Sequence, residues 1–332
     1  MKVMTTEITA TLMIIILCCI VLTVADAMVC GVLKLVAGVP FKMAFQRGLL
    51  SLLLPPVLIA YGTLVERNWF KIKNIEIAVK NLPDAFNGYR IIHISDIHAR
   101  SFIGREKHLA RAIDKINELD PDIVAFTGDL ITLSPEELDS LARPLRGITA
   151  KDGTFSVLGN HDYSIYSNAS EKARQAHLED LISREKTLGW ELLLDQSRII
   201  RKGTDSIAII GVQNISPSKH FPSKGNLEKA SEGTDGMFRI VLSHDPMHWE
   251  SEILGQDYPL TLSGHTHAMQ LSLLGWCPSS LMFDQYRGLY TRSGQSIYVN
   301  PGLGETIFPA RIGVRPEITL ITLVRRNESQ IN

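Results

Sequence analysis

The first quarter of the chain is almost entirely apolar. Residues 8–25 carry no charged side chain, and beyond Asp26 the apolar run continues for seven more residues. A second uncharged run covers residues 48–65, where two adjacent prolines interrupt it. Each run approaches the ~20 apolar residues that a helix needs to cross a membrane. The pattern therefore predicts two transmembrane helices, at about residues 8–33 and 46–66, with a kink at the prolines.

Alternatives to this interpretation stay open. The first run could be a signal peptide, although no small-residue cleavage site follows it, and the anchor could have one span instead of two. Asp26 is either a functional carboxylate within the membrane or, as we prefer, a mark of the interfacial end of the first helix. We assign residues 1–70 to a membrane anchor, 71–88 to a linker and first strand, 89–326 to a soluble domain and 327–332 to a tail.

Within the soluble domain, the spacing of apolar positions is that of an α/β protein. Five short β-branched runs are bounded by Gly, Asn, Asp or His, which is typical of buried strands that end in loops. They cover residues 90–95, 122–126, 155–158, 239–242 and 260–263. Helical periodicity predicts helices at residues 106–119, 135–145 and 170–188. The alternation indicates helices layered on a sheet, with functional sites at the carboxyl ends of the strands.

Later runs indicate a second sheet. Residues 197–200 and 206–212 are typical of a hairpin that turns at a Lys-Gly pair. Residues 298–300 and 317–324 have the composition of late strands. We therefore expect an α/β fold in the form of a four-layer α-β-β-α sandwich of two mixed sheets, preceded by the N-terminal transmembrane helices.

Composition excludes several classes of protein. With 45% hydrophobic residues, the 332-residue chain is too apolar to be disordered. Its 34 basic and 35 acidic residues give a net charge of −1, so no basic excess favours a nucleic-acid partner. Three of the four cysteines lie in the apolar quarter, which leaves Cys277 alone in the soluble domain and excludes a disulfide scaffold.

Charge also bears on membrane orientation. The segment between the two predicted helices carries three basic side chains, whereas the flanks outside them carry five. The positive-inside rule therefore favours a cytoplasmic soluble domain held at the inner or plasma membrane of the cell.

Polar side chains that can bind metals follow each of the five predicted strands. They are Asp96, His98, Asp129, Asn160, His161, His244, His265 and His267. Each is a weak signal alone, but together they form a large set of carboxylate and imidazole ligands, which suits Mn, Fe or Zn. There are too many ligands for one tetrahedral site, so the set indicates a centre of two divalent metals.

The motifs that carry these side chains lie in the order found in a known family. They are Asp96-Ile-His98, Gly128-Asp129, Gly159-Asn-His-Asp162, His244 and Gly264-His-Thr-His267. This set resembles the motifs of the calcineurin-like metallophosphoesterases, and it extends over nearly the whole soluble domain. With its apolar N-terminal segments, the chain is similar to the bacterial membrane-tethered branch, which includes enzymes like UDP-2,3-diacylglucosamine pyrophosphatase. One departure is that Ala268-Met269 stands where that branch usually has two glycines, so side chains there could narrow the approach to the metals.

The resemblance implies a role for each motif residue. The implied ligands are Asp96, His98 and His267 for one metal, Asn160, His244 and His265 for the other, and Asp129 bridging the two. His161 would stabilise or protonate the leaving oxygen, and Asp162 would set the orientation of His161. The implied reaction is attack on phosphorus by a hydroxide held between two divalent cations, of which manganese is favoured.

Fewer signals bear on the substrate. His248, Met269 and Gln270 are candidates to line a substrate cleft, because each follows a ligand motif closely. The loop of residues 213–236 leaves a predicted strand end between two ligand motifs, which favours a cap over the site.

The expected function is hydrolysis of a phosphoric ester or pyrophosphate at a membrane. The anchor favours membrane lipid as a partner and a phosphorylated, lipid-linked substrate, with UDP-2,3-diacylglucosamine in lipid A synthesis as the most specific hypothesis. A general phosphodiesterase or phosphatase that acts on another envelope substrate is the enzyme alternative. A non-catalytic membrane receptor or scaffold is the alternative of another class, and the complete ligand set argues against it.

Overall fold

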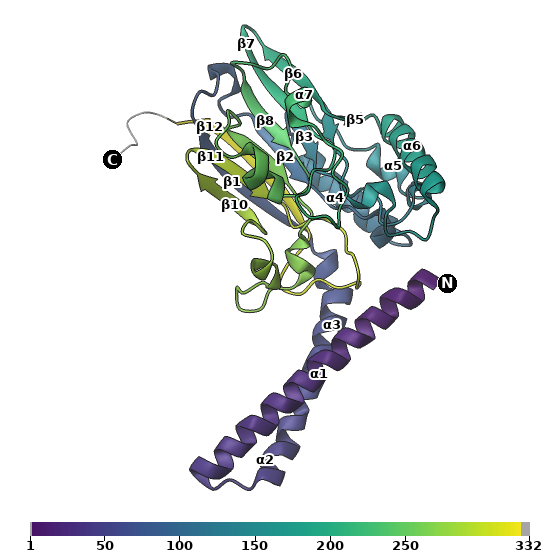
Figure 1. Cartoon of the computed structure of the whole chain (residues 1–332), viewed down its shortest axis with the longest axis vertical. Coiled ribbons are helices and arrows are strands. Elements are labelled where there is room, and N and C mark those ends of the chain that lie inside the picture. The colour runs from purple at the N-terminus through teal and green to yellow at the C-terminus, as the bar shows by residue number, and fades with distance from the viewer. Residues whose placement is uncertain (1, 327–332) are drawn as a thin grey trace.

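The anchor is a helical hairpin at one end of the molecule (Figure 1). In this computed structural model, which describes residues 2–326, helix α1 (Lys2–Ala37) runs away from the soluble domain. The chain returns through helical segments that end at Asn68: α2 (Phe41–Gly48), η1 (Leu49–Leu53), α3 (Leu54–Leu64) and η2 (Glu66–Asn68). The predicted tail, residues 327–332, lies outside the described residues.

Two helical stretches are long and apolar enough to cross a membrane, Glu7–Ala37 and Phe41–Asn68. The apolar side chains of these stretches are largely exposed in the isolated chain, and a lipid bilayer would cover them. The second stretch changes from α to 3₁₀ hydrogen bonding over Leu49–Leu53, just before its two prolines. Because proline has no backbone N–H, it fits the first turn of the new helix α3.

Asp26 does not end the first helix, because α1 continues to Ala37. The Ser51 hydroxyl donates a hydrogen bond to Oδ2 of Asp26 at 2.6 Å, from the returning arm of the hairpin. Gly48 allows the two arms to approach there, since a Cβ at this position would lie 3.1 Å from Cγ of Asp26. Asp26 is therefore a polar contact between the two arms.

The soluble domain contains two six-stranded mixed sheets, as the sequence predicts. The first sheet has the order β1 (Lys71–Val79), β12 (Glu317–Arg325), β2 (Arg90–Ile94), β3 (Ile123–Phe126), β4 (Thr154–Ser156) and β5 (Glu191–Leu192). The second has the order β10 (Gly288–Arg292), β11 (Gln295–Val299), β9 (Leu260–Ser263), β8 (Phe238–Leu242), β7 (Asp205–Gly211) and β6 (Gln196–Lys202). The strands that precede the metal-ligand motifs run parallel to one another within each sheet.

Apolar side chains from both sheets form the central core. Ile91, Ile123 and Phe155 of the first sheet belong to one buried cluster with Ile209 and Leu262 of the second. Because successive side chains of a strand point to opposite faces, the other faces of the sheets are covered separately.

Helices cover the two outer faces unequally. The outer face of the first sheet packs against α4 (Glu106–Glu118), α5 (Ala142–Leu145) and α6 (Glu171–Leu188). The second sheet is covered by one short helix, α7 (Leu227–Ala230), and a π-helical turn, Trp249–Ile253. The four-layer sandwich is thus present, with a thin fourth layer.

One predicted helix is two short pieces. The segment 135–145 consists of a 3₁₀ turn, Pro135–Leu138, and the four-residue α5. Pro144 explains the break, because it has no backbone N–H to bond to the carbonyl of Ser140 and is tolerated only in the first turn of a new helix. Strand β10 was not predicted, because its Leu-Tyr-Thr-Arg run lies at an exposed sheet edge and lacks a buried apolar pattern.

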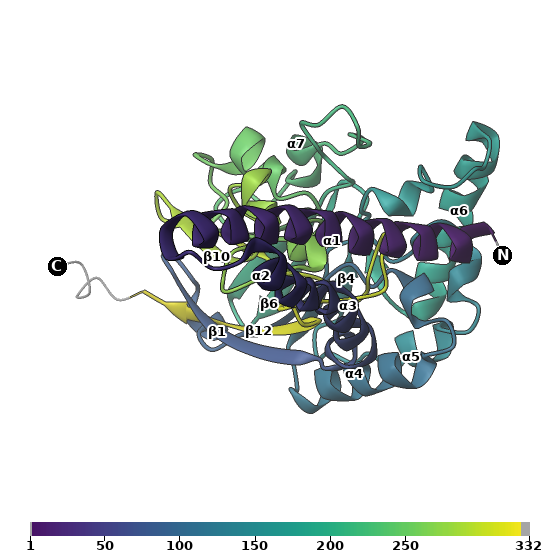
Figure 2. The ribbon, with the colours of Figure 1, turned by 90° about the horizontal axis from the view of Figure 1, so that it is seen from below.

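The anchor reaches the domain at the end where the ligand-bearing loops lie. Figure 1 shows the N-terminal turns of α1 next to this end of the domain and the rest of α1 running away from it, and Figure 2 looks at the same end from below. Glu7 in the first turns of α1 forms an ion pair of 2.7 Å with Arg100, which follows the Asp96-Ile-His98 motif by two residues. The fold therefore brings the start of the first apolar stretch close to the candidate site.

Candidate metal centre

The five ligand motifs meet at the carboxyl ends of strands from both sheets. Asp96 and His98 follow β2, and their backbone N–H groups bond to the carbonyls of Gly128 and Asp129 in the loop after β3. Asp96, His98, Asp129, His265 and His267 all have a positive φ, between 42° and 72°. This conformation is uncommon for residues other than glycine, and such strain is typical of functional sites.

The first ligand group consists of Asp96, His98 and His267. Nε2 of His267 lies 3.2 Å from Oδ1 of Asp96 and 2.9 Å from Nε2 of His98. Asp96 and His98 are fully buried, and His267 is 4% exposed. These are the three residues that the resemblance assigns to one metal.

The second ligand group consists of Asn160, His244 and His265. Oδ1 of Asn160 lies 3.1 Å from Nε2 of His244 and 2.7 Å from Nδ1 of His265. Asp129 lies between the groups, because its Oδ2 is 3.2 Å from Nε2 of His244 and 3.6 Å from Nε2 of His98. The geometry brings together all seven residues predicted as metal ligands.

The donor atoms of these groups fit two divalent cations. Nδ1 of His244 donates to the Thr127 carbonyl at 2.7 Å, which turns the lone pair of Nε2 toward Asp129 and Asn160. Lone pairs of His98, His267 and Asp96 likewise face one another, and such lone pairs repel unless a proton or cation lies between them. Carboxylate and imidazole ligands suit Mn, Fe or Zn, and the geometry does not choose among them.

Glycines permit the close approach of these loops. A Cβ on Gly264 would lie 1.9 Å from Oγ of Ser95 and 2.3 Å from Oδ2 of Asp96. A Cβ on Gly159 would lie 2.2 Å from Oδ1 of Asp129. Any larger residue at either position would therefore displace a metal-ligand carboxylate.

Electrostatic interactions within the cluster favour an ionised Asp129. Burial would raise the pKa of Asp129, but the interactions with the imidazoles of His244 and His161 outweigh burial and hold that pKa well below its usual value. Burial lowers the pKa of His98 well below its usual value, which keeps this imidazole neutral and able to bind a cation.

Asp162 has a different role from the one that the resemblance implies. Its carboxylate accepts hydrogen bonds of 2.8–3.1 Å from four backbone N–H groups, those of Asp129, Leu130, Ile131 and Gly159. The expected orientation of His161 by Asp162 is therefore wrong. Asp162 instead ties together the loops that carry Asp129 and Asn160. Burial, and next the charge of Asp129, raise its pKa to about 7.

A backbone carbonyl orients His161. Nδ1 of His161 bonds to the carbonyl oxygen of Thr132 at 2.8 Å, and its backbone N–H donates to Oδ1 of Asp129. The ring lies edge-on to that of His98, with centroids 4.7 Å apart. A ligand atom of His161 also lies within 4.8 Å of those of His98 and Asp129. Nδ1 faces the carbonyl, so Nε2 is the nitrogen available to a substrate oxygen or a metal.

The motif match is confirmed by comparison with known proteins. Residues 89–269, more than half of the chain, match the model of the calcineurin-like phosphoesterase family. The chain belongs to this family. Its two mixed sheets are those expected from the sequence.

Relatives of this phosphoesterase occur in animals and bacteria. It is 35% identical to a zebrafish (Danio rerio) protein named transmembrane protein with metallophosphoesterase domain, over 84% of this chain and 63% of that protein. A bovine (Bos taurus) protein of the same name is 30% identical over 83% of this chain and 62% of its own length. The phosphoesterase thus spans about three fifths of these two relatives. The Bacillus subtilis metallophosphoesterase YkuE is 32% identical over 77% of this chain and 87% of that protein.

These names support membrane association, together with the two apolar helical stretches. They do not confirm the narrower resemblance to enzymes that hydrolyse UDP-2,3-diacylglucosamine. Among solved structures, the phosphopantetheinyl hydrolase PptH of Mycobacterium tuberculosis aligns with a TM-score of 0.37 at 11% identity, over 64% of this chain and 88% of that one. That likeness is too weak to carry a conclusion.

Two residues predicted to line the substrate cleft of the phosphoesterase do not. His248 is fully buried, with Nδ1 2.8 Å from Oγ of Ser243. Gln270 is 2% exposed, and its amide nitrogen donates to the carbonyls of Phe308 and Ala310. Both predictions are wrong because a polar residue close to a ligand motif can equally hold neighbouring loops together.

Met269 is half-buried, and its place in a cleft stays a prediction. Ala268, Met269 and Gln270 all have left-handed backbone conformations, with φ of 49°, 47° and 55°. Glycine adopts this conformation without strain, so the two glycines usual in the membrane-tethered branch would fit here better than the residues of this chain.

Sequence reasoning missed an aromatic rim around the site. The ring of Tyr166 stacks on that of His161, with centroids 4.1 Å apart, and its hydroxyl accepts a hydrogen bond from the side-chain amide of Asn160 at 3.0 Å. The rings of Phe221 and Phe283 lie edge-on to His265, at 4.8 and 5.8 Å. Phe221 comes from the loop of residues 213–236, and its contact with His265 agrees with the expectation that this loop lies beside the site. No local motif marks these aromatics, because they meet the ligands only in the folded chain.

Proposed function

We propose that this phosphoesterase hydrolyses a phosphorylated compound held in the membrane, at a centre of two divalent metals. The observation that carries the proposal is the place of Asp129 between the two ligand groups, at the end of the domain that contacts the anchor. Neither group alone explains a carboxylate placed between them.

Each chain residue has a part in this proposal. Asp96, His98 and His267 would hold one cation and Asn160, His244 and His265 the other, with Asp129 between them. Cations bound there would supply positive charge to the phosphate oxygens and lower the pKa of a coordinated water.

His161 would contact the phosphate or the leaving oxygen through Nε2, because the Thr132 carbonyl holds its Nδ1. Tyr166 stacks on the ring and would keep it in that orientation. The neutral amide oxygen of Asn160 adds no negative charge to the centre, which therefore keeps positive charge for an anionic substrate.

The most specific substrate hypothesis is a nucleotide–lipid pyrophosphate such as UDP-2,3-diacylglucosamine, an intermediate of lipid A synthesis. The anchor supports it, because an acylated substrate stays in the membrane beside the centre. A phosphodiesterase or phosphatase that acts on another membrane phosphate is the alternative within the same chemistry.

Purified full-length protein assayed with Mn²⁺, Fe²⁺ or Zn²⁺ separates these substrates. Release of UMP from UDP-2,3-diacylglucosamine, with little turnover of aryl phosphates, supports the specific hypothesis. Rapid turnover of aryl phosphates without UMP release contradicts it. If His161→Ala and Asp129→Asn both hydrolyse every substrate as fast as the parent protein, the assigned centre is wrong.

The cytoplasmic side of an inner or plasma membrane is the proposed location of the domain. Proteolysis of sealed vesicles tests this orientation. Protection of the domain in right-side-out vesicles agrees with the proposal, and cleavage there contradicts it.

A further inference from the structure

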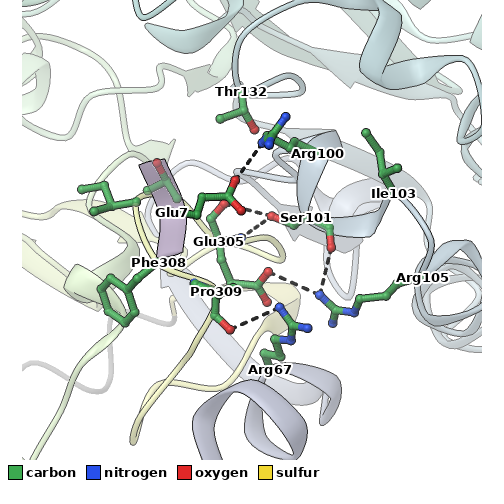
Figure 3. Close-up of a pocket in the computed structure, with 12 residues that line it drawn as sticks. Glu7, Arg67, Arg100, Ser101, Ile103, Arg105, Thr132, Glu305, Phe308 and Pro309 are labelled. Atoms are coloured by element: carbon green, nitrogen blue, oxygen red, sulfur yellow. Dashed lines mark hydrogen bonds and ion pairs between the residues drawn. The ribbon is translucent and has the colours of Figure 1, made fainter. Parts of the chain in front are cut away.

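A cavity of about 360 Å³ lies where the anchor meets the catalytic domain (Figure 3). Five segments that are distant in the sequence form its walls: the first turns of α1, the η2 turn, the loop after His98, the loop after β3 and the loop of residues 305–309. Three arginines line it, Arg67, Arg100 and Arg105, together with two acidic residues, Glu7 and Glu305. We call it the junction pocket.

The junction pocket lies at the domain-side ends of the two apolar stretches. Glu7 is the first residue of one apolar stretch, and Arg67 is the last but one of the other. If both stretches cross a membrane, the cavity is at the level of its surface. Ile103 and Ile307 also line it, and they are 51% and 68% exposed. Exposed apolar side chains at that level are placed to contact acyl chains.

The opposite wall of the pocket belongs to the metal centre. Arg100 follows the metal ligand His98 by two residues. Thr132 lines the pocket, and its carbonyl oxygen holds Nδ1 of His161, while its hydroxyl lies 3.5 Å from Nδ1 of His98. A molecule that occupies the pocket is thus one residue away from the imidazoles of the centre.

The polar groups of the pocket leave positive charge unused. Three arginines face two carboxylates, so the formal charge is +1. Arg100 pairs with Glu7 through Nε, whereas Arg105 donates to Glu305, to the Ser101 carbonyl and to Oδ1 of Asn68. Nη1 of Arg67 donates to the Pro309 carbonyl at 3.2 Å, and its buried Nε is without a hydrogen-bond partner among the described residues. Guanidinium groups bind phosphate through pairs of parallel N–H donors, which suits Arg67 and Arg100, and Arg105 adds charge.

We propose that the junction pocket binds the phosphate of an anionic lipid at the membrane surface and presents that lipid to the metal centre. The role in presenting a substrate rests on the proposed function, but the binding of lipid phosphate does not. A lipid is favoured over free phosphate because the arginines lie at both membrane exits and apolar side chains form the rim.

Binding to full-length protein in dodecyl maltoside micelles tests the pocket directly. Native mass spectrometry measures the affinity for dioctanoyl phosphatidic acid and dioctanoyl phosphatidylcholine, with inorganic phosphate as a competitor. Each titration is run with and without a chelator, so that phosphate bound at the metal centre is told apart. We expect one phosphatidic acid per chain, bound at least about tenfold more tightly than phosphatidylcholine, with or without chelator.

Two variants test the pocket in different ways. Arg105→Gln removes one guanidinium, and Ile307→Glu adds a carboxylate at the exposed rim without removing a polar contact. Each should weaken phosphatidic acid binding about tenfold. Arg143→Gln is the matched control for the loss of an arginine, because Arg143 is exposed on α5. Ile307→Gln is the control of equal size and no charge, and both controls should bind like the parent protein.

Equal affinity for the two lipids, or parent-like binding by both Arg105→Gln and Ile307→Glu, overturns the proposal. Displacement of the lipid by an equal concentration of inorganic phosphate overturns the lipid as the ligand. Hydrolysis of UDP-2,3-diacylglucosamine and of an aryl phosphate, both measured with the same parent preparation, separates the two claims. Hydrolysis without selective lipid binding refutes the pocket alone, whereas selective lipid binding without any hydrolysis refutes the proposed function and supports the pocket.

Discussion

The metal centre and the junction pocket are neighbours built in opposite ways. The seven residues predicted as ligands of the centre follow strands of the two sheets and lie within five short motifs; six of them are buried and His265 is half-buried. The junction pocket is assembled from five separate segments, and its Glu7–Arg100 ion pair is partly exposed. Strand ends can hold the ligand side chains in the strained conformations that catalysis needs. A pocket between the anchor and the domain can select which molecule binds beside the centre. Changes in the centre should therefore abolish activity, and changes in the pocket should only adjust it.

Asp129→Asn should have the largest effect on activity. The substitution keeps the shape of the side chain but removes the charge that lies between the two ligand groups. We expect the kcat for an aryl phosphate to fall by about a thousandfold or more, by analogy with the loss of one strong electrostatic contact to the reacting groups. The measurement is initial rates with added Mn²⁺, together with metal content. A parent-like rate would place the chemistry elsewhere.

Asp162→Ala should destabilise the domain most among the changes near the centre. It leaves four buried backbone N–H groups without their acceptor. We expect a loss of roughly 3 kcal/mol in unfolding free energy, because each unsatisfied buried donor is costly. Denaturant unfolding followed by circular dichroism measures it. An unchanged midpoint would show that these hydrogen bonds contribute little.

Glu185→Gln should change how stability depends on pH. Burial, and next the charge of Asp162, raise the pKa of Glu185 to about 8, and its Oε1 is without a hydrogen-bond partner among the described residues. The folded state then binds a proton that the unfolded state releases near its ordinary pKa, so stability falls as pH rises from about 4.5 to about 8. The variant should be more stable than the parent at pH 9, by roughly 2–4 kcal/mol, and similar to it at pH 4. Unfolding at the two pH values checks this, and an equal gain at both would contradict it.

Glu7→Gln should have the smallest effect. The Glu7–Arg100 pair is partly exposed, with side-chain exposures of 36% and 26%, so its loss should cost less than about 1 kcal/mol. Thermal unfolding in a lipid nanodisc measures the change. A loss of several kcal/mol would show that this contact, and not the rest of the junction, holds the anchor to the domain.

The clustering of the predicted ligands follows from the sequence because its signals are local. A motif such as Gly264-His-Thr-His267 contains both ligands and the glycine that allows them to approach Asp96. Parallel strands bring such motifs to one edge, so their meeting follows from the predicted strands. The strands of the two sheets are predictable for the same reason, because each strand is indicated by a pattern of apolar positions within a few consecutive residues.

Other features depend on contacts between distant residues and leave no local pattern. Tyr166 stacks on His161, and Arg67 meets Arg105 and Glu305 across the junction, only after folding. For Asp162 and His248 the sequence predicts too much. Because each lies in or beside a motif, Asp162 is expected to orient His161 and His248 is expected to line the substrate cleft. Their side chains instead satisfy polar groups of the loops around them.

Metal stoichiometry measured together with activity tests the central claim most directly. Full-length protein is stripped with a chelator and titrated with Mn²⁺, while bound metal and aryl phosphate hydrolysis are followed in the same samples. The shared Asp129 predicts two bound ions per chain and activity that reaches its maximum only with the second ion. Full activity with one ion, or with none, would contradict a centre of two metals.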